Sequence, residues 1–337
     1  MERILIIQTA FLGDAILTLP MLQKLREQKN ERSIDVICIP STYEVFEHSP
    51  SVDNTIVLYK RGEHKSLFGL YKFAKQLKKN NYSKIISPHR SFRSSLLTAL
   101  LKVKDTVGFD NASLKFIYRK TIHYKIKDHE VQRNLKLIEA ETEGENWKIL
   151  PRIKIKEEQK NSIDSALSEL SIKKFIAIAP GSVWQTKQYP RELFIEVIKL
   201  LRGKGDNIVL IGGKDDEELC GSITSGFNSG VFSFAGKLSI VESIELLKRA
   251  DGLICNDSAP THMAMCADIP VLTIYCSTVP EFGFYPYNTK SDWLSYSELD
   301  CKPCGIHGYD KCPIGTFECA HKIVPQKVIS AIEELIN

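Results

Sequence analysis

Four short polar segments hold the residues whose types and spacing could do chemistry, and each follows an apolar run that is typical of a buried strand. They are the pair Gly13–Asp14, PGSVWQTKQYP (180–190), GGKDDEE (212–218) and NDSAPTH (256–262). In the last of them, small polar residues and a proline lead into HMAMCA, a pattern typical of a strand, a tight turn and a helix N-terminus. Helix N-termini bind anions through outward-pointing amides and a positive dipole end. The spacing therefore predicts an anion-binding turn at 256–262.

Asp14 is the carboxylate best placed for acid–base chemistry. It follows Gly13 inside the apolar run ILIIQTAFLGDAILTLPML (4–22), where a first strand should end and a first helix should begin. A carboxylate there can remove a proton from a reacting hydroxyl group. It can equally serve as a helix N-cap. The residues alone leave both roles open.

Composition limits the class of protein. The chain has 337 residues, 43% hydrophobic and 26% charged, which is typical of a globular protein with room for two cores. The run 4–22 is too polar at Gly13 and Asp14 for a membrane span and lacks the pattern of a signal peptide. We therefore expect a cytoplasmic protein. Nine cysteines in such a chain favour reduced thiols or metal ligands over disulfides.

Short apolar runs alternate with amphipathic stretches along the whole chain. The runs expected as strands are 3–8, 34–39, 54–59 and 83–88, then 174–180, 207–213, 230–236, 251–257 and 270–276. This rhythm predicts two α/β domains with parallel, Rossmann-like sheets, which place ligands at the carboxyl ends of their strands. We expect the boundary between the domains inside 150–172, at Pro151 or just after it. The expected domains are 1–160 and 161–320, with a final helix in 321–337 that crosses back to the first.

The two halves differ in charge. Residues 1–150 carry 25 Lys and Arg against 17 Asp and Glu, and the stretch 60–93 holds a single acidic residue. Such a field favours an anionic partner or peripheral contact with an anionic membrane, although a solvated helix face explains it as well. Cationic side chains suited to a carboxylate or phosphate on a ligand lie in SPHRSFRSS and DHEVQRN: they are His89, Arg90, Arg93, His129 and Arg133.

Four cysteines gather near the C-terminus, in a stretch rich in Gly and Pro. Cys301, Cys304, Cys312 and Cys319 give the spacing C-x2-C-x7-C-x6-C. Four thiols this close suit tetrahedral Zn or Fe, and reduced thiols in a loop are the alternative. A metal bound by all four would be structural, because no coordination position would stay open for catalysis.

Four segments together resemble the lipopolysaccharide heptosyltransferase family, glycosyltransferase family 9. They are ILIIQTAFLGDAILTLPMLQKLR, APGSVWQTKQYP, GKLSIVESIELLKRADGLICNDSAPTHMA and CKPCGIHGYDKCPIGTFEC. The resemblance covers both halves in the same order. It implies a GT-B fold, two facing Rossmann-like domains with a cleft between them. It also implies transfer of heptose from ADP-heptose to an anionic, lipid-linked core sugar, with inversion at the anomeric carbon and no cofactor for catalysis. One branch of the family looks to have a four-cysteine iron site, and the cysteine cluster of this chain resembles it in the number of cysteines.

The resemblance assigns roles residue by residue. It makes Asp14 the catalytic base and places Gly13 among the donor-binding residues. It makes Lys187 both a catalytic residue and the lysine that contacts the donor, with Ser182 reaching the same group. The segment Asp257, Ser258, Ala259 with His262 would cradle the pyrophosphate, and Lys237 and Leu238 would meet the adenine. The carboxylate for the ribose would come from Asp215, Asp216 or the two glutamates that follow them.

Other functions fit these residues less well or stay open. A nicotinamide-dependent oxidoreductase is disfavoured, because QTAFLGD lacks the G-x-G-x-x-G pattern. A non-catalytic GT-B binding protein is disfavoured by the joint presence of Asp14, Lys187, Asp257 and His262. A donor other than ADP-heptose, and a protein or another glycan as acceptor, stay open. No nucleic-acid partner is expected.

Overall fold

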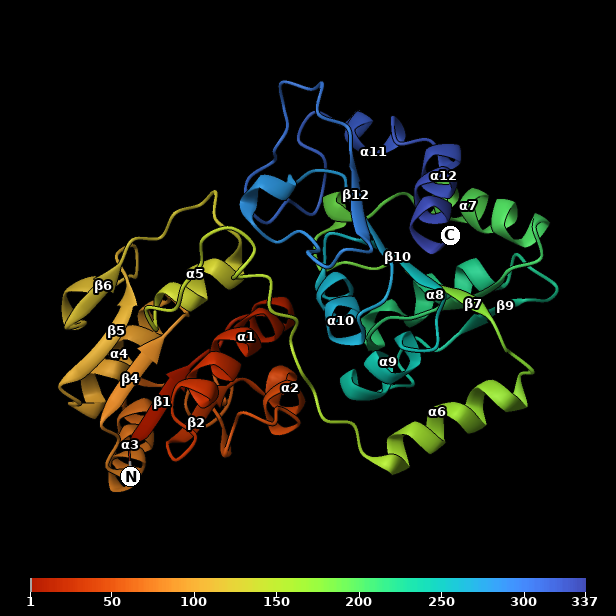
Figure 1. Ribbon diagram of the computed structural model, residues 1–337. Helices are drawn as coiled ribbons and strands as arrows, with labels where there is room; N and C mark the ends of the chain where they lie inside the picture. The colour runs from red at the N-terminus through yellow and green to blue at the C-terminus, as the bar shows by residue number, and fades with distance from the viewer. Residues whose placement is uncertain (1) are drawn as a thin grey trace. The chain divides into compact units, whose positions relative to one another are not determined.

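The computed structural model describes residues 2–337, which divide into two compact units between Lys154 and Ile155. Each unit contains one six-stranded sheet whose strands are all parallel, and helices connect successive strands (Figure 1). The two Rossmann-like sheets predicted from the sequence are thus confirmed. Their facing arrangement and the cleft between them stay predictions.

The first unit has the strand order β3-β2-β1-β4-β5-β6. Its strands are β1 (Arg3–Ile7), β2 (Ser33–Cys38), β3 (Asn54–Val57), β4 (Lys84–Ser87), β5 (Asp105–Phe109) and β6 (Lys120–Ile122). Its α-helices are α1 (Leu12–Gln28), α2 (Tyr43–Glu47), α3 (Leu67–Leu77), α4 (Phe92–Leu101) and α5 (Glu130–Lys136). Leu5, Ile37 and Ile85 of the sheet form one core with Leu70 and Leu97 of α3 and α4.

The second unit repeats this topology, with the order β12-β11-β10-β7-β8-β9. Its strands are β7 (Phe175–Ala179), β8 (Asn207–Leu210), β9 (Val231–Ser233), β10 (Gly252–Asn256), β11 (Val271–Tyr275) and β12 (Ser291–Ser295). Its α-helices are α6 (Glu157–Glu169), α7 (Arg191–Gly203), α8 (Glu217–Thr224), α9 (Ile240–Leu247), α10 (Ala259–Ala267), α11 (Glu318–His321) and α12 (Pro325–Ile336). Three-residue 3-10 turns lie between them, among them η4 (Gln185–Lys187) and η5 (Lys214–Asp216).

The strand order fixes where a ligand can bind. In each sheet the connections reverse direction beside the first strand, between β1 and β4 and between β7 and β10. The carboxyl ends of strands at such a reversal are where doubly wound sheets bind ligands. Asp14 follows β1 and Arg90 follows β4. Lys187 follows β7 and Asp257 follows β10. The loops that contain these four residues therefore lie at the reversal point of their own sheet.

Three strands were not expected from the sequence: β5, β6 and β12. β5 reads DTVGF, and the ring of Tyr118 packs so closely on Gly108 that a Cβ there would lie 2.7 Å from the Tyr118 Cζ. β12 is an edge strand in which Asp292 and Trp293 are exposed. β6 is an edge strand of only three residues. Short edge strands lack the continuous apolar run that marks a buried strand.

The division between Lys154 and Ile155 lies inside 150–172, just after Pro151, and six residues before 160. Helix α6 packs on α9 of the second unit, and Arg249 Nε donates to Asp164 Oδ1 over 2.7 Å. The whole of α6 therefore belongs to the second unit. Helix α12 packs on α7, β10 and β11, and Ile332 and Ile336 lie against Gly252. Its described packing is thus within the second unit, and its return to the first unit stays a prediction.

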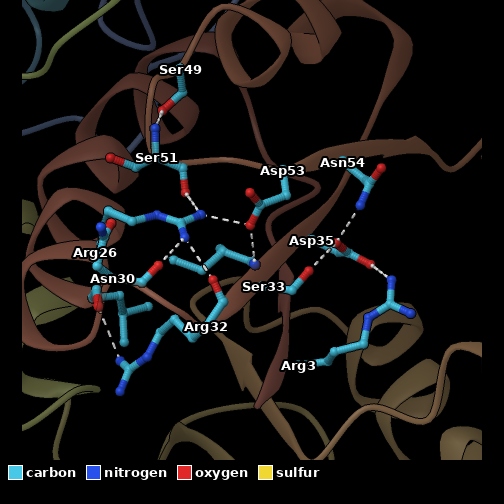
Figure 2. A network of polar contacts seen from close by, with 12 residues as sticks. Arg3, Arg26, Asn30, Arg32, Ser33, Asp35, Ser49, Ser51, Asp53 and Asn54 are labelled. Atoms are coloured by element: carbon cyan, nitrogen blue, oxygen red, sulfur yellow. Dashed lines mark hydrogen bonds and ion pairs between the residues drawn. The ribbon is translucent and has the colours of Figure 1, made fainter. Parts of the chain in front are cut away.

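A polar network ties together the amino-terminal ends of β1, β2 and β3, at the sheet edge opposite to Asp14 (Figure 2). The carboxylate of Asp35 is 1% exposed and accepts hydrogen bonds from Arg3, Asn54 and Tyr82, at 3.2, 2.9 and 2.7 Å. Arg26, near the end of α1, donates to Asp53 Oδ2 over 2.6 Å. These contacts position the strands and lie away from the reacting edge.

We expect Asp35→Ala to lower the free energy of unfolding by about 2–3 kcal/mol, because it removes a buried carboxylate that accepts hydrogen bonds from half-buried Arg3, exposed Asn54 and buried Tyr82. Chemical denaturation of the variant measures this effect. Glu27→Ala is the matched control, since Glu27 pairs with Lys24 on the surface, and its cost should be about 0–1 kcal/mol. Equal losses in the two variants would contradict the structural role of Asp35.

No helix within residues 2–337 is both long enough and apolar enough to cross a membrane.

Candidate functional site

Asp14 lies in the first turn of α1, directly after β1. The N-cap of α1 is Phe11, so Asp14 is the third helical residue and is not the N-cap. Its backbone carbonyl accepts a hydrogen bond from Thr18 Oγ1 (2.8 Å), whose hydroxyl also accepts one from Gln8 Nε2 (2.8 Å). The half-buried carboxylate is thus carried by a well-anchored helix start, as a general base requires.

A cluster of charged and aromatic side chains lies near Asp14. Glu130 Oε2 pairs with Arg133 Nε at 2.9 Å and accepts a hydrogen bond from the Tyr124 hydroxyl at 3.3 Å. The guanidinium groups of Arg90 and Arg133 lie 3.9 and 4.5 Å from the centre of the Tyr124 ring. Burial raises the pKa of Glu130 to about 7, Arg133 opposes that rise, and the nearby charge of Asp14 adds to it. Asp14 therefore lies within electrostatic reach of this cluster.

His89 and Lys60 connect the loops that follow β4, β1 and β3. His89 Nδ1 shares hydrogen bonds with Thr9 Oγ1 (2.8 Å) and Ser94 Oγ (2.9 Å), and Lys60 Nζ donates to the Thr9 carbonyl (2.5 Å). Burial, Lys60 and Arg90 lower the pKa of His89 to about 4. Burial, with a smaller effect of the nearby Arg93 charge, lowers the pKa of Lys60 to about 8. His89 is therefore neutral at pH 7 and could meet an anion as a hydrogen-bond donor, so its place in the acceptor site stays a prediction.

Three other predicted acceptor residues are engaged within the protein. His129 is 0% exposed, caps α5 through Nδ1, and stacks on Trp147. Arg133 is 1% exposed in its pair with Glu130. Arg93 donates to the carbonyls of His64 and Lys65, at 2.6 and 3.0 Å. Of the predicted cations, half-buried Arg90 is the one whose position suits direct contact with a ligand, and the other three are better suited to positioning.

In the second unit, the loops after β7 and β10 meet in an ion pair. Lys187 Nζ lies 2.6 Å from Asp257 Oδ2, and the two side chains are 14% and 9% exposed. The same oxygen of Asp257 accepts a hydrogen bond from Thr278 Oγ1 at 2.6 Å. An ammonium group has three donors, so Lys187 can bind a further anion while Asp257 holds it. The structure thus brings two predicted donor residues into direct contact.

The turn 256–262 forms the predicted helix N-terminus. Asn256, fully buried, accepts from Tyr189 N (2.8 Å) and donates to the Pro180 carbonyl (2.7 Å), which ties this turn to the loop after β7. Ser258 is the N-cap of α10, and its side chain makes no capping bond to the helix amides. His262 is buried, its Nδ1 has no hydrogen-bond partner among the described residues, and burial lowers its pKa to about 4.

The acidic residues that follow β8 have different surroundings. Asp216 Oδ2 accepts a hydrogen bond from Gly213 N (2.9 Å), and its carboxylate packs so closely on Gly181 that a Cβ there would overlap it. Burial raises the pKa of Asp216. The Glu217 carboxylate packs in the same way on Gly236, the residue before Lys237. Asp216 therefore braces two loops, and Glu217 lies beside the loop predicted to meet the adenine.

The remaining predicted donor residues lie on loops of the second unit. The Ser182 carbonyl accepts a hydrogen bond from Gln188 Nε2 (2.7 Å), one residue after Lys187. Lys237 is exposed and donates to the Ser233 carbonyl (2.9 Å), and Leu238 beside it is half-buried. Asp215 lies in η5.

The four clustered cysteines line one cavity of about 220 Å³. Burial raises the pKa of Cys312, but backbone amides of Phe317, Ile314, Gly315 and Thr316 donate to its sulfur and lower the pKa overall. Within residues 2–337, no three His, Cys, Asp or Glu side chains are arranged to hold a metal ion. The thiols thus share a cavity without forming a metal site in the conformation shown.

Four residues of these clusters were missed by sequence reasoning: Lys60, Tyr124, Glu130 and Thr278. Tyr124 and Glu130 flank residues already singled out, but nothing in a single sequence indicates that a tyrosine ring receives two guanidinium groups. Thr278 lies two residues after a predicted strand, in the same kind of place as the polar loops that were recognised.

Comparison with known proteins agrees with this arrangement. The model of glycosyltransferase family 9 (heptosyltransferase) matches residues 70–308. Lipopolysaccharide heptosyltransferase 2 of Salmonella typhimurium is 22% identical, over 99% of each chain. A family 9 glycosyltransferase from Veillonella parvula superimposes with a TM-score of 0.87 at 24% identity, covering 99% of this chain and 97% of that one. The E. coli ADP-heptose lipopolysaccharide heptosyltransferase II gives 0.80 at 19% identity, covering 100% and 98%. The match over most of the chain, with the GT-B fold of those structures, shows that this chain belongs to glycosyltransferase family 9, the heptosyltransferase family.

Proposed function

We propose that this glycosyltransferase transfers heptose from ADP-heptose to an anionic, lipid-linked lipopolysaccharide core sugar, with inversion at the anomeric carbon. In this proposal the second unit binds the nucleotide sugar and the first unit binds the acceptor. The observation that carries it is the ion pair of Lys187 and Asp257 beside the N-terminus of α10, at the reversal point of the second sheet. The choice of heptose and of ADP rests on the names of the similar proteins.

The donor diphosphate would bind at the start of α10. The backbone amides of Ser258 and Ala259 and the positive end of the helix dipole suit an anion. Pro260, the third residue of the predicted cradle 258–260, has no amide hydrogen to donate. Lys187 adds a full positive charge from the adjoining loop. Negative charge grows on the diphosphate as the bond to the sugar breaks, and groups fixed in advance stabilise that change most effectively. His262, neutral and buried, can offer a hydrogen bond there.

Asp14 would act as the general base on the acceptor. Its carboxylate accepts the proton of the acceptor hydroxyl while that oxygen forms the new bond to the anomeric carbon of the donor. The bond from the anomeric carbon to the diphosphate oxygen breaks in the same step, and ADP leaves with the electron pair. Attack from the opposite face inverts the configuration at that carbon.

Glu217 is our candidate for the ribose carboxylate. Its position against Gly236 places it beside Lys237 and Leu238, whereas Asp216 is already hydrogen bonded and packed against Gly181. Carboxylates at the corresponding edge of Rossmann-like sheets accept hydrogen bonds from ribose hydroxyls. Asp215 stays a second candidate for this role.

Arg90 is our candidate for the acceptor's anionic group. Its guanidinium is oriented by the Tyr124 ring and lies in the cluster that includes Glu130 near Asp14. A planar guanidinium held in this way suits two-point recognition of a phosphate or carboxylate. Lys60 supplies a second positive charge nearby, through its bond to Thr9.

Calorimetric titration without acceptor tests the donor assignment. We expect ADP and ADP-heptose to bind, and UDP and NAD to bind much more weakly. Preference for UDP would mean a different donor on the same fold. Absence of binding by all four ligands would favour a non-catalytic protein.

We further propose that the four cysteines hold a structural Zn or Fe ion. Support comes from their common cavity and from the amides that favour a thiolate at Cys312. Because no three of these side chains within residues 2–337 are arranged around one point, the thiols would have to turn toward a common centre to bind it. Elemental analysis of the protein purified under reducing conditions tests this, and less than a tenth of an equivalent of either metal would contradict it.

Helix α3 is our candidate for contact with the cytoplasmic membrane surface. Leu67, Phe68 and Tyr71 are exposed on it, beside Lys72 and Lys75. Exposed apolar side chains among lysines suit an anionic lipid surface. Sedimentation with vesicles containing phosphatidylglycerol should depend on Phe68, and equal binding by Phe68→Ser and the unsubstituted protein would contradict this contact.

A further inference from the structure

The cysteine-rich loop is bonded directly to the turn that carries Lys187. Thr186 N donates to the Tyr309 carbonyl over 3.0 Å, and Tyr309 N donates back to Thr186 Oγ1 over 2.8 Å. Thr186 Oγ1 also accepts a hydrogen bond from Ser277 Oγ at 3.0 Å. This reciprocal pair of bonds fixes the residue next to Lys187 against a loop more than a hundred residues away in the chain.

The same two segments meet again on either side of that pair. The rings of Trp184 and His307 stack with centroids 6.3 Å apart and planes at 22°. Cys304 N donates to the Ser277 carbonyl over 2.8 Å, next to Thr278, the residue that bonds Asp257. The loop therefore contacts both sides of the Lys187–Asp257 pair.

Gly308 is the point of closest approach. It has a φ of +79°, and a Cβ built on it would lie 2.9 Å from Thr186 Oγ1, 3.1 Å from Ser277 Oγ and 3.2 Å from Lys187 Cγ. Real Cβ atoms essentially never come closer than 3.0 Å, so any side chain here would push on Thr186 and on the aliphatic stem of Lys187. A glycine is needed at this place for space as well as for its backbone conformation.

From these contacts we infer that the cysteine-rich loop positions the donor-binding lysine, with Gly308 and Thr186 as the positioning residues. Neither residue touches the donor. They act by holding the Lys187 ammonium beside Asp257, where it meets the donor diphosphate. The inference rests on the proposed donor role of Lys187, and it gives the cysteine cluster a function besides stability, because a change in the loop alters donor binding through this contact.

Gly308→Ala tests the inference, with Gly305→Ala as its matched control. Gly305 lies in the same loop at a φ of +77°, but a Cβ there would make one ordinary contact, 3.8 Å from the Tyr309 hydroxyl. Both variants therefore carry the same backbone strain, and only Gly308→Ala pushes on Lys187. We expect Gly308→Ala to weaken ADP binding about 10- to 100-fold in calorimetry, and Gly305→Ala to leave it nearly unchanged.

A double-mutant cycle separates positioning from general loosening of the fold. In a Lys187→Ala background, Gly308→Ala should have no further effect on ADP binding, because the two residues act through one contact. Thr186→Val keeps the shape of the side chain and removes the hydroxyl, and it should weaken ADP binding in the same way. It replaces Gly308→Ala in the test if that variant does not fold. Weak binding by Lys187→Ala together with normal binding by Gly308→Ala or Thr186→Val would overturn this inference alone. Normal binding by Lys187→Ala would overturn the donor role and the inference together.

Discussion

Replacing Asp14 with Asn should reduce the rate of heptosyl transfer by about 10²- to 10⁴-fold, the usual contribution of a positioned general base. Asn keeps the size of the side chain and cannot accept the proton of the acceptor hydroxyl. Asp14 lies third in α1, whose N-cap is Phe11, so loss of a cap does not complicate the result. Initial rates of ADP release with donor and acceptor present measure the effect.

The same variant should bind ADP as tightly as the unsubstituted protein, because the proposed nucleotide residues all belong to the second unit. Asp105→Asn is the matched control: it also removes one carboxylate from the first unit, and Asp105 pairs with Lys84 at the surface. Transfer by Asp14→Asn at the rate of this control would show that Asp14 is not the base.

Replacing Lys187 with Ala should lower kcat/KM by about 10²- to 10³-fold, the loss typical of removing one group that stabilises developing negative charge. The ammonium is the only side-chain cation that the described contacts place on Asp257, whose side chain is 9% exposed. Without the ammonium, that carboxylate keeps the hydrogen bond from Thr278. The KM for the donor should rise as well, because the ground-state diphosphate also loses a contact. Steady-state kinetics over donor concentration measure both effects.

Thermal unfolding must accompany those kinetics, since breaking a buried ion pair can cost about 3–5 kcal/mol. Lys204→Ala is the control, because it removes one positive charge from the same unit and Lys204 pairs with Glu333 at the surface. A Lys187→Ala variant that is folded at the assay temperature and matches Lys204→Ala in kcat/KM would refute a role for Lys187 in the transfer step.

The sequence allowed the architecture and the donor loops to be predicted, because both depend on local patterns. Buried parallel strands are continuous apolar runs, and the polar loops after β7 and β10 necessarily share one sheet edge. The contact between Lys187 and Asp257 follows from that topology. The edge strands β6 and β12 escaped prediction because one is very short and the other is mixed in polarity.

The surroundings of the predicted acceptor residues could not be read from the sequence, because burial and side-chain pairing depend on tertiary structure. His129 and Arg133 look like surface cations in DHEVQRN, yet they are buried by Trp147 and by Glu130 with Tyr124. Burial of His89 and the nearby charges of Lys60 and Arg90 all lower its pKa, and none of these effects is visible in the sequence. The hydrophobic periodicity of a single sequence does not indicate which polar side chains are buried or paired.

The most direct test of the account is a transfer reaction with purified protein, ADP-heptose and a lipid-linked core acceptor. ADP release and the anomeric configuration of the product would be followed together. We expect one ADP released for each sugar transferred, inversion at the anomeric carbon, and loss of both signals in Asp14→Asn. No transfer from ADP-heptose, under conditions where a UDP-sugar is turned over by the same protein, would contradict it.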